Sequence, residues 1–481
     1  MTLTSFTFVA FALCVALLSN ASRNPEWRSW VLLLANTVFI GSYVNQPLAL
    51  LPLAAFLLLC FGSIEFVRRS RSGPLFWGSL SAILASFVLL KKFSFLSESW
   101  LLPFPYLLMG LSYVLFRALH LLIDARQGEL KQPISPRDFF NYTCNFLTFT
   151  AGPIQRFEAY QAQREQTVAL DEAAVFRAFS RVTLGFLKVA AVSAIFNHLF
   201  ATVSGRVLDP VGSAALSAHG FGLAFVVSAL CYTVYLYYNF SGYVDIVIGV
   251  GWLCGQQLPE NFNQPFLARS FLDFWSRWHM TLSDWFKTYV FNPLLKILAG
   301  RFRAAKAAPY LAVVAFFVTF TIMGVWHGTT SVFLIYGLVL GFGASVNKLW
   351  QVLAQQRLGK KRYKALAETA PAIYLSRGLT LAYFAIALSC LWLDLGQLVA
   401  IVGRLGVLGS AACYVGLALA SGGAFFAWDA LWARLSRLAS GDQELFRGVT
   451  ARNVGLALQL LLIATVASFF HKAPEFVYRA F

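Results

Sequence analysis

Two histidines in a largely apolar chain are its best candidates for chemistry. His279 lies in the segment FWSRWHMTLSDWFKTYVFNPL, and His327 lies in GVWHGTT. An imidazole near its ordinary pKa takes a proton from a hydroxyl group at neutral pH, which makes an alcohol nucleophilic toward an acyl thioester. Burial keeps the imidazole neutral, and a second donor can stabilise the oxyanion or orient the acyl carbonyl. This chemistry predicts His327 as the base and His279 as the second donor.

Each histidine also has a purely structural interpretation. His279 could be a satisfied residue of a surface-lying anchor helix, and His327 could be hydrogen-bonded to a backbone carbonyl with no chemical role. The sequence contains no G-x-S-x-G, H-E-x-x-H or P-loop motif, so serine hydrolysis, zinc proteolysis and nucleotide hydrolysis lack support. Seven cysteines are scattered without a C-x-x-C pair, and no metal site is expected.

The segment 271–290 is predicted to form one amphipathic helix at the membrane interface. At about 100° per residue, Trp278 falls on an aromatic face and Arg277 on the opposite face, with His279 at the edge of the aromatic stripe. Asp273 and Arg277 have the spacing of a favourable i,i+4 ion pair. Enrichment in Trp and Tyr is typical of helices that lie in membrane interfaces.

The second histidine follows a strongly apolar run that ends at Trp326. Basic stretches at 301–306 and 348–364 flank the predicted hairpin at both outer ends, and such stretches favour the cytoplasmic side. The GVWHGTT turn is therefore expected away from the cytoplasmic edge, within or across the membrane. An ionisable residue is costly at that depth unless it has a function.

Composition places both histidines in an integral membrane protein. The 481 residues are 58% hydrophobic and 12% charged, and the mean hydropathy is +0.66. We predict an all-α fold with ten to twelve transmembrane helices and additional re-entrant or amphipathic helices. Candidate spans lie near 5–22, 29–44, 46–66, 74–91, 101–123, 179–203, 213–237, 243–258, 308–326, 331–350, 372–394, 397–420 and 454–471.

The formal net charge of +17 is concentrated in loops and indicates cytoplasmic segments rather than a nucleic-acid partner, because no soluble basic domain is present to bind one. Residues 1–481 are expected to form a single polytopic membrane domain. Its parts are N-terminal spans at 1–125, a catalytic core at 126–350, and C-terminal spans at 351–481 that include a basic loop at 354–378. No internal repeat is evident, which weakens a transporter interpretation.

Several ordered motifs resemble one known family. The run from YYNFSGYVDIVIG at 237 through PENFNQP and FWSRWHMTLSDWF to NPL at 294 is followed by GVWHG at 324–328. Two upstream stretches, GLSYVLFRALHLLID and FLTFTAGPIQRF, belong to the same pattern. Together they resemble the bacterial branch of the membrane-bound O-acyltransferase (MBOAT) family, which includes the alginate O-acetylation and teichoic-acid D-alanyl transfer membrane proteins.

The resemblance implies that His327 matches the essential catalytic histidine of the family and that His279 matches the second histidine of the same chamber. It also implies a ring of spans around a thinned centre. The donor would reach this centre from the cytoplasm, and the acceptor would reach it from outside.

Five other residues are expected to line the chamber or bind substrate: Trp278, Arg277, Asp245, Trp326 and Asn261. Asp245 lies in an apolar stretch, and an ion pair with Arg277 or Arg269 is an alternative to a direct role in the site. Asn261 is expected to shape the loop that leads to the aromatic segment.

The function implied is transfer of an acyl group, with acetyl expected, from a cytoplasmic thioester donor to a hydroxyl of a cell-envelope polysaccharide or to a periplasmic partner of the SGNH type. The donor, acetyl-CoA or an acyl carrier protein, is a co-substrate, and no tightly bound cofactor is expected. Partners are the lipid bilayer and the donor, without nucleic acid, and the location is the inner (cytoplasmic) membrane. D-alanyl transfer to a teichoic-acid-like polymer and non-enzymatic transport or flipping remain open as alternatives.

Overall fold

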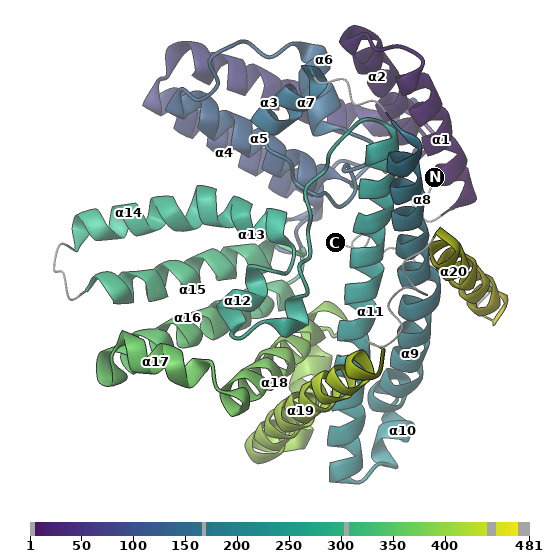
Figure 1. Cartoon of the computed structure of the whole chain (residues 1–481). Coiled ribbons are helices and arrows are strands. Elements are labelled where there is room, and N and C mark those ends of the chain that lie inside the picture. Colours follow the sequence, from purple (N-terminus) through teal and green to yellow (C-terminus); the bar gives the residue numbers. More distant parts are fainter. Residues whose placement is uncertain (1–4, 166–169, 303–306, 440–448, 470–481) are drawn as a thin grey trace. The chain divides into compact units, whose positions relative to one another are not determined.

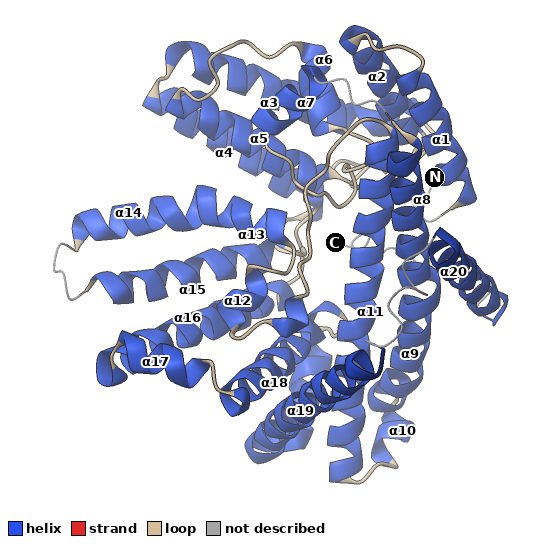
Figure 2. Cartoon of the chain, viewed as in Figure 1, coloured by secondary structure: helices blue, strands red, loops and turns tan. Residues whose placement is uncertain are grey.

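The computed structural model describes residues 5–165, 170–302, 307–439 and 449–469, and within these ranges the secondary structure is helical, with no β-strand beyond one isolated bridge (Figures 1 and 2). The α-helices are α1 (Phe6–Asn20), α2 (Pro25–Gly41), α3 (Leu51–Ser70), α4 (Gly73–Lys91), α5 (Leu111–Gln127), α6 (Pro136–Thr143), α7 (Phe157–Glu165), α8 (Glu172–Phe186), α9 (Ala194–Leu208), α10 (Pro210–Ala214), α11 (Ala218–Leu253), α12 (Phe271–Trp275), α13 (Met280–Phe286), α14 (Asn292–Arg301), α15 (Ala308–Trp326), α16 (Val332–Leu358), α17 (Lys360–Ala367), α18 (Ala370–Ala387), α19 (Leu395–Ala439) and α20 (Val449–Phe469). The predicted all-α membrane fold is therefore confirmed.

Eight helical segments of the described chain are long and apolar enough to cross a membrane. They are Pro47–Ser70, Gly73–Lys91, Glu172–Leu208, Ala218–Leu253, Ala308–Trp326, Val332–Leu358, Ala370–Leu391 and Leu395–Leu435. Two further apolar helices, Thr7–Asn20 and Val454–Thr465, are shorter than a span, so the described residues contain eight such segments where ten to twelve were expected. The expected span at 101–123 is shorter than predicted, because the segment before Gly110 contains Pro103 and Pro105 and α5 begins only at Leu111.

The basic loop predicted at 354–378 is largely helical. α16 continues to Leu358, Gly359 has a positive φ of 76°, and α17 begins at Lys360. Lys, Arg, Ala and Leu all have high intrinsic helix propensity, so a charged stretch of this composition extends a helix rather than ending it. Helical structure in this stretch is interrupted at Gly359 and again at Glu368 and Thr369, between α17 and α18.

The chain divides into two compact units that interleave along the sequence. Of the described residues, the first unit contains 5–165, 170–186 and 240–260, and the second contains 187–239, 261–302, 307–439 and 449–469. In the first unit, Arg117 of α5 is 1% exposed and donates to the carbonyl oxygens of Thr143 and Thr148 at 2.7 and 2.8 Å. A buried cation is thus satisfied by the backbone of the 143–148 turn.

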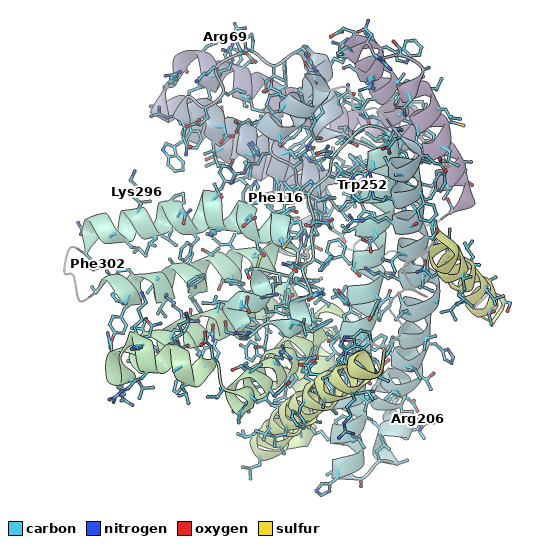
Figure 3. The ribbon with its side chains drawn as sticks, in the orientation of Figure 1. Arg69, Phe116, Arg206, Trp252, Lys296 and Phe302 are labelled. Carbon is cyan, nitrogen blue, oxygen red and sulfur yellow. The ribbon has the colours of Figure 1, made fainter. Side chains whose placement is uncertain are left out.

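The second unit holds both candidate histidines. Its most closely packed helical pairs are α15 with α16 and α18 with α19. α19 bends at Gly406, whose φ of 65° departs from helical geometry. Lys296 is exposed in the middle of α14, and Phe302 is exposed directly after the last residue of α14 (Figure 3).

Candidate active site

The segment around His279 is a broken helix, not the single helix predicted for 271–290. α12 ends at Trp275, α13 starts at Met280, and a π-helical segment at Lys287–Phe291 leads into α14. The break coincides with His279, which has a left-handed backbone at φ 44° and ψ 52°. The helical spacing of aromatic residues in the sequence does not reveal this break. The aromatic residues lie on the same side of α12 and α13, so their spacing looks like that of one continuous helix.

A short antiparallel pairing holds this break in place. Met280 donates its backbone N–H to the carbonyl of Asn261 at 2.9 Å, and Asn263 donates to the carbonyl of Arg277 at 2.9 Å. The isolated bridge between Phe262 and Trp278 lies between these two bonds. The strand-like contact interrupts the helix because the backbone groups on both sides of His279 are bonded to residues 261 and 263.

The Asn261 side chain completes the clamp. Its Oδ1 accepts a hydrogen bond from Thr281 Oγ1 at 2.6 Å and from the Thr281 backbone N–H at 3.3 Å. Asn261 itself is fully buried. Asn261 was expected to shape this loop, and these bonds confirm it. Asn261 also caps the first turn of α13, directly after His279.

A left-handed conformation costs a residue with a Cβ about 1–2 kcal/mol. His279 adopts it while 1% exposed, inside a segment fixed from both sides. Strain of this kind persists only where surrounding contacts impose it, and it is concentrated at functional sites. The backbone therefore supports a role for His279 beyond anchoring.

Trp278 forms part of an aromatic wall next to His279. Its ring stacks on Phe274 at 5.5 Å and meets Phe262 at 5.1 Å and Phe384 of α18 at 4.9 Å. Trp278 is 2% exposed. The predicted separation of aromatic and polar faces thus survives the break, and the wall excludes water from one side of the histidine.

Two predicted charged residues have partners of their own. Arg277 donates its Nε to Asp273 Oδ1 at 2.9 Å, which confirms the i,i+4 pair. Asp245 pairs within its own unit, whereas its two predicted partners, Arg277 and Arg269, belong to the other unit, so those pairs stay a prediction. Arg181 of α8 binds Asp245 at 3.1 Å and Glu260 at 2.6 Å, while its guanidinium lies 4.9 Å from the Trp252 ring.

His327 sits at the C-terminal end of α15 and is 4% exposed. Its Nδ1 lies 2.7 Å from the carbonyl oxygen of Met323, one turn earlier. A carbonyl oxygen only accepts hydrogen bonds, so Nδ1 carries the proton and the neutral ring keeps an unprotonated Nε2. A hydrogen bond to a backbone carbonyl was the basis of the purely structural interpretation of His327. The same bond places the proton on Nδ1, which is the tautomer required for a general base that acts through Nε2.

Aromatic rings orient the His327 imidazole. Trp326 lies 4.8 Å from it and Tyr336 of α16 lies 5.4 Å from it, both at steep angles. Tyr336 is 2% exposed. The predicted residue Trp326 therefore contacts the candidate base directly, and Tyr336 is an additional contact that sequence analysis did not identify.

Glycines bring α15 and α16 into backbone contact beneath His327. A Cβ on Gly324 would collide with the backbone of Gly337, and a Cβ on Gly337 would collide with the carbonyl of Thr321. Gly328, after the histidine, lies under the Phe333 ring with no room for a side chain. The absence of side chains at these glycines allows the backbones of α15 and α16 to approach each other closely beside His327.

The two imidazoles act on each other electrostatically. Both residues lie outside the eight candidate spans, and burial lowers the pKa of each from its ordinary value. For His279, the charge of His327 lowers the pKa further. Both rings are therefore neutral at physiological pH, and the second unit brings the two predicted site histidines within electrostatic range of each other.

Comparison with known protein families places both histidines within a single family match. The model of the membrane-bound O-acyltransferase family, MBOAT, matches residues 39–386, which include both histidines and the segment that clamps His279. The chain belongs to the MBOAT family. It is accordingly a multi-pass membrane protein and an O-acyltransferase.

Relatives within the MBOAT family carry two different names. The chain is 30% identical to the teichoic acid D-alanyltransferase of Streptococcus thermophilus over 336 residues, covering 69% of this chain and 78% of that protein. The corresponding protein of Bacillus subtilis is 29% identical over 286 residues, covering 58% and 70%. The probable alginate O-acetylase AlgI of Pseudomonas aeruginosa is 30% identical over 270 residues, covering 55% of this chain and 47% of AlgI.

Sequence reasoning missed the residues that hold the histidines. Met323, Thr281 and Tyr336 have no unusual spacing or charge, so only three-dimensional contact reveals them. A usable signal existed for Met323 alone, because it lies four residues before a helix-terminal histidine. At that spacing a side chain can bond back to the helix backbone.

Proposed function

We propose that this MBOAT protein transfers an acyl group, with acetyl expected, from a thioester donor on the cytoplasmic side to a hydroxyl group of a cell-envelope polysaccharide or to a periplasmic partner. The observation that supports this most is the 2.7 Å bond from His327 Nδ1 to the Met323 carbonyl, which places the ring proton on Nδ1 and makes Nε2 the basic nitrogen of the neutral ring. The neutral state favoured by burial supports the same role.

The proposed step runs as follows. His327 Nε2 removes the proton of the acceptor hydroxyl while its oxygen attacks the thioester carbonyl carbon. The tetrahedral intermediate collapses by breaking the carbon–sulfur bond, and the imidazolium returns its proton to the departing thiolate. An ester and a free thiol result, and His327 is again neutral.

His279 is proposed to stabilise or orient the acyl oxygen rather than to act as a second base. Its left-handed backbone and the Asn261 clamp hold it in one place next to the Trp278 wall. Fixed donors aimed at a developing negative charge are worth more in a water-poor site than in solution. The 1% exposure of His279 supports that setting.

A second candidate is D-alanyl transfer to a teichoic-acid-like polymer. Two relatives named teichoic acid D-alanyltransferase align over 70% and 78% of their lengths, against 47% for AlgI of Pseudomonas aeruginosa. Both candidates use the same step at His327 and differ in the acyl group. The donor, acetyl-CoA or an acyl carrier protein, the periplasmic partner and the inner-membrane location belong to the proposal in either case.

The test measures ester-linked acyl groups on purified envelope polysaccharide after mild alkaline release. A deletion strain is complemented with wild type, His327→Ala, His279→Ala or His219→Ala at matched membrane levels. His219 is the control because it is exposed at the start of α11 in the same unit. We expect esters with wild type and His219→Ala and none with His327→Ala, and the released acid identifies the acyl group as acetate or D-alanine.

Unchanged ester content in the deletion strain would overturn the polysaccharide acceptor. If polymer export then failed together with His327→Ala, the protein would move cargo instead of transferring an acyl group. Restoration of esters by His327→Ala would overturn the role of His327 as the base.

A further inference from the structure

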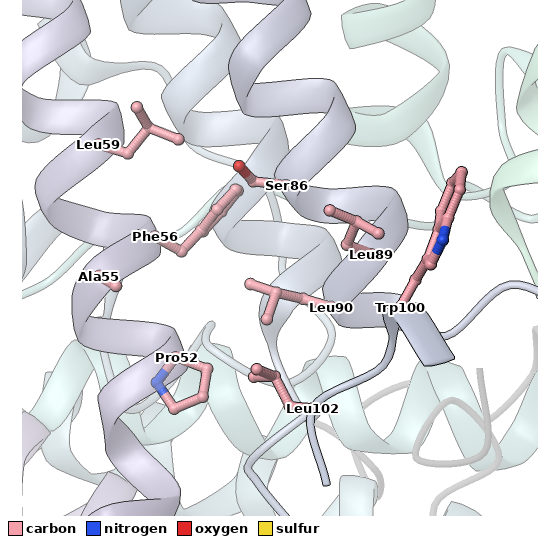
Figure 4. A pocket seen from close by; sticks show the side chains of 9 residues that line it. All are labelled: Pro52, Ala55, Phe56, Leu59, Ser86, Leu89, Leu90, Trp100 and Leu102. Atoms are coloured by element: carbon pink, nitrogen blue, oxygen red, sulfur yellow. The ribbon is translucent and has the colours of Figure 1, made fainter. Parts of the chain in front are cut away.

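An apolar groove lies in the first unit between α3 and α4, away from both histidines in the sequence (Figure 4). Its volume is about 330 Å³. The lining residues come from α3, from α4 and from the segment that follows α4: Pro52, Ala55, Phe56, Leu59, Ser86, Leu89, Leu90, Trp100 and Leu102. All except Ser86 are apolar, so the groove suits a hydrocarbon chain.

The groove lies at one end of a transmembrane hairpin. α3 and α4 are antiparallel candidate spans joined by the turn at 71–72, where Arg71 has a left-handed backbone. The lining residues belong to the start of α3 and the end of α4, which are the ends farthest from that turn. The groove therefore opens within one membrane leaflet, opposite the Arg68–Arg71 cluster, with the 69% exposed Trp100 at its margin as membrane interfaces prefer.

Two lysines end α4 directly after the lining residue Leu90. Lys91 is 9% exposed, and among the described residues its ammonium has neither an ion-pair partner nor a hydrogen-bond acceptor. Lys92 places its Nζ 4.7 Å from the centre of the Tyr106 ring, and the Tyr106 hydroxyl donates to the Leu90 carbonyl at 2.9 Å. The Lys91 side chain is mostly buried while its ammonium stays accessible and has no counter-ion in the described chain, so this end of α4 fits an anionic partner from outside the chain.

The nearest acid in the sequence does not supply that counter-ion. Glu98 is exposed in the segment after α4, and it forms no ion pair with Lys91 or Lys92 in the described part of the chain. The end of α4 therefore keeps an excess of positive charge beside an apolar groove. A ligand that fits both features has a negative head and a hydrocarbon tail.

We propose that this groove is a binding site for an anionic phospholipid. One acyl chain lies in the groove against Phe56 and Leu89, and the headgroup phosphate lies at Lys91 and Lys92. Neither acyl-transfer histidine lines the groove, and the proposal does not depend on the transfer function. A free phosphate ion would use the lysines but leave the apolar groove unexplained.

The test compares phosphatidylglycerol with phosphatidylcholine of the same acyl chains, added at equal concentrations to the purified full-length protein and measured by native mass spectrometry. Wild type is expected to retain phosphatidylglycerol preferentially. Lys92→Gln should reduce the phosphatidylglycerol-to-phosphatidylcholine ratio about fivefold, the factor for one cation beside an anionic lipid. Lys360→Gln is the matched control, because Lys360 is an exposed lysine on α17.

Two further variants separate the tail from the head. Ala55→Phe places a ring in the groove from an exposed position of α3 and should reduce binding of both lipids. Lys91→Met removes the charge of a mostly buried side chain, so it should raise the unfolding temperature in lipid-free detergent while abolishing the further increase that phosphatidylglycerol gives to wild type.

Equal retention of both lipids by wild type would overturn the proposal, as would an equal loss of phosphatidylglycerol in Lys360→Gln. Inorganic phosphate is added as a separate arm. Stabilisation by phosphate alone, equal to that by phosphatidylglycerol, would make the site an anion site and refute a lipid ligand.

Discussion

The two candidate catalytic histidines are held by opposite means. His327 ends a regular helix, and its ring is fixed by the ordinary i to i−4 geometry of that helix through Met323. His279 lies in a break between two short helices, and backbone pairing with residues 261–263 imposes its left-handed conformation. One position follows from local helical structure, whereas the other depends on a distant segment.

This difference matches the demands of the two proposed roles. A base needs a defined tautomer, which a single hydrogen bond to a carbonyl provides. A group that stabilises charge needs a defined place, which requires the surrounding backbone to be rigid. The bond from His327 to Met323 in α15 meets the first need, and the Asn261 clamp meets the second.

The largest expected effect comes from replacing each histidine by glutamine. His327→Gln removes the base and should lower the rate of acyl transfer by about 10²–10⁴-fold. His279→Gln keeps an amide N–H in the site, so its loss should be at least tenfold smaller. Initial rates in membranes with equal protein levels measure both. Equal losses in the two variants would mean that the histidines share one role and would remove the distinction drawn between them.

The second-largest expected effect is a loss of stability in the hairpin of α15 and α16. Gly337→Ala adds a Cβ against the Thr321 carbonyl and should destabilise the protein by about 1–3 kcal/mol, seen as a lower unfolding temperature in detergent. Gly300→Ala is the matched control in α14, where a Cβ meets no atom within 4 Å. That substitution should leave stability unchanged or raise it slightly. A tolerated Gly337→Ala would show that close helix contact is not required under His327.

A smaller effect is expected for the clamp on the other histidine. Asn261→Leu and Thr281→Val each remove one side of the 2.6 Å hydrogen bond and should destabilise by about 1 kcal/mol or more. Because both act on one bond, the double variant should cost less than the sum of the single variants. Activity should fall in each. Additive losses would mean that Asn261 and Thr281 do not act together.

Much of the hairpin could be predicted from the sequence. Its apolar runs are long, its basic flanks are cytoplasmic in type, and Gly324 and Gly328 bracket the only ionisable side chain of the turn. Each of these signals is local, and local signals survive folding when the element is a regular helix. The burial of aromatic residues in 271–286 was predictable for the same reason.

The break at His279 could not be predicted in this way. It arises because Asn261 and Asn263 pair with residues near His279, and a periodic pattern gives no indication of such a partner. The same limit applies to Asp245, whose partner Arg181 lies 64 residues away on α8 and was not among the expected partners. Pairings between distant segments follow from the tertiary fold rather than from composition.

The smallest expected effect tests the strain at His279 directly. Both His279→Gly and His279→Ala remove the imidazole and should lose activity alike, but only glycine adopts φ 44° without a steric penalty. We therefore expect His279→Gly to be about 1 kcal/mol more stable than His279→Ala, measured by unfolding temperature in the same detergent. At His327, whose φ of −67° is ordinary for a helix, the order should reverse, because glycine is less favourable than alanine there. If glycine were the less stable replacement at both positions, the left-handed backbone at His279 would store no strain, and the contrast between the two histidines would reduce to their hydrogen bonds.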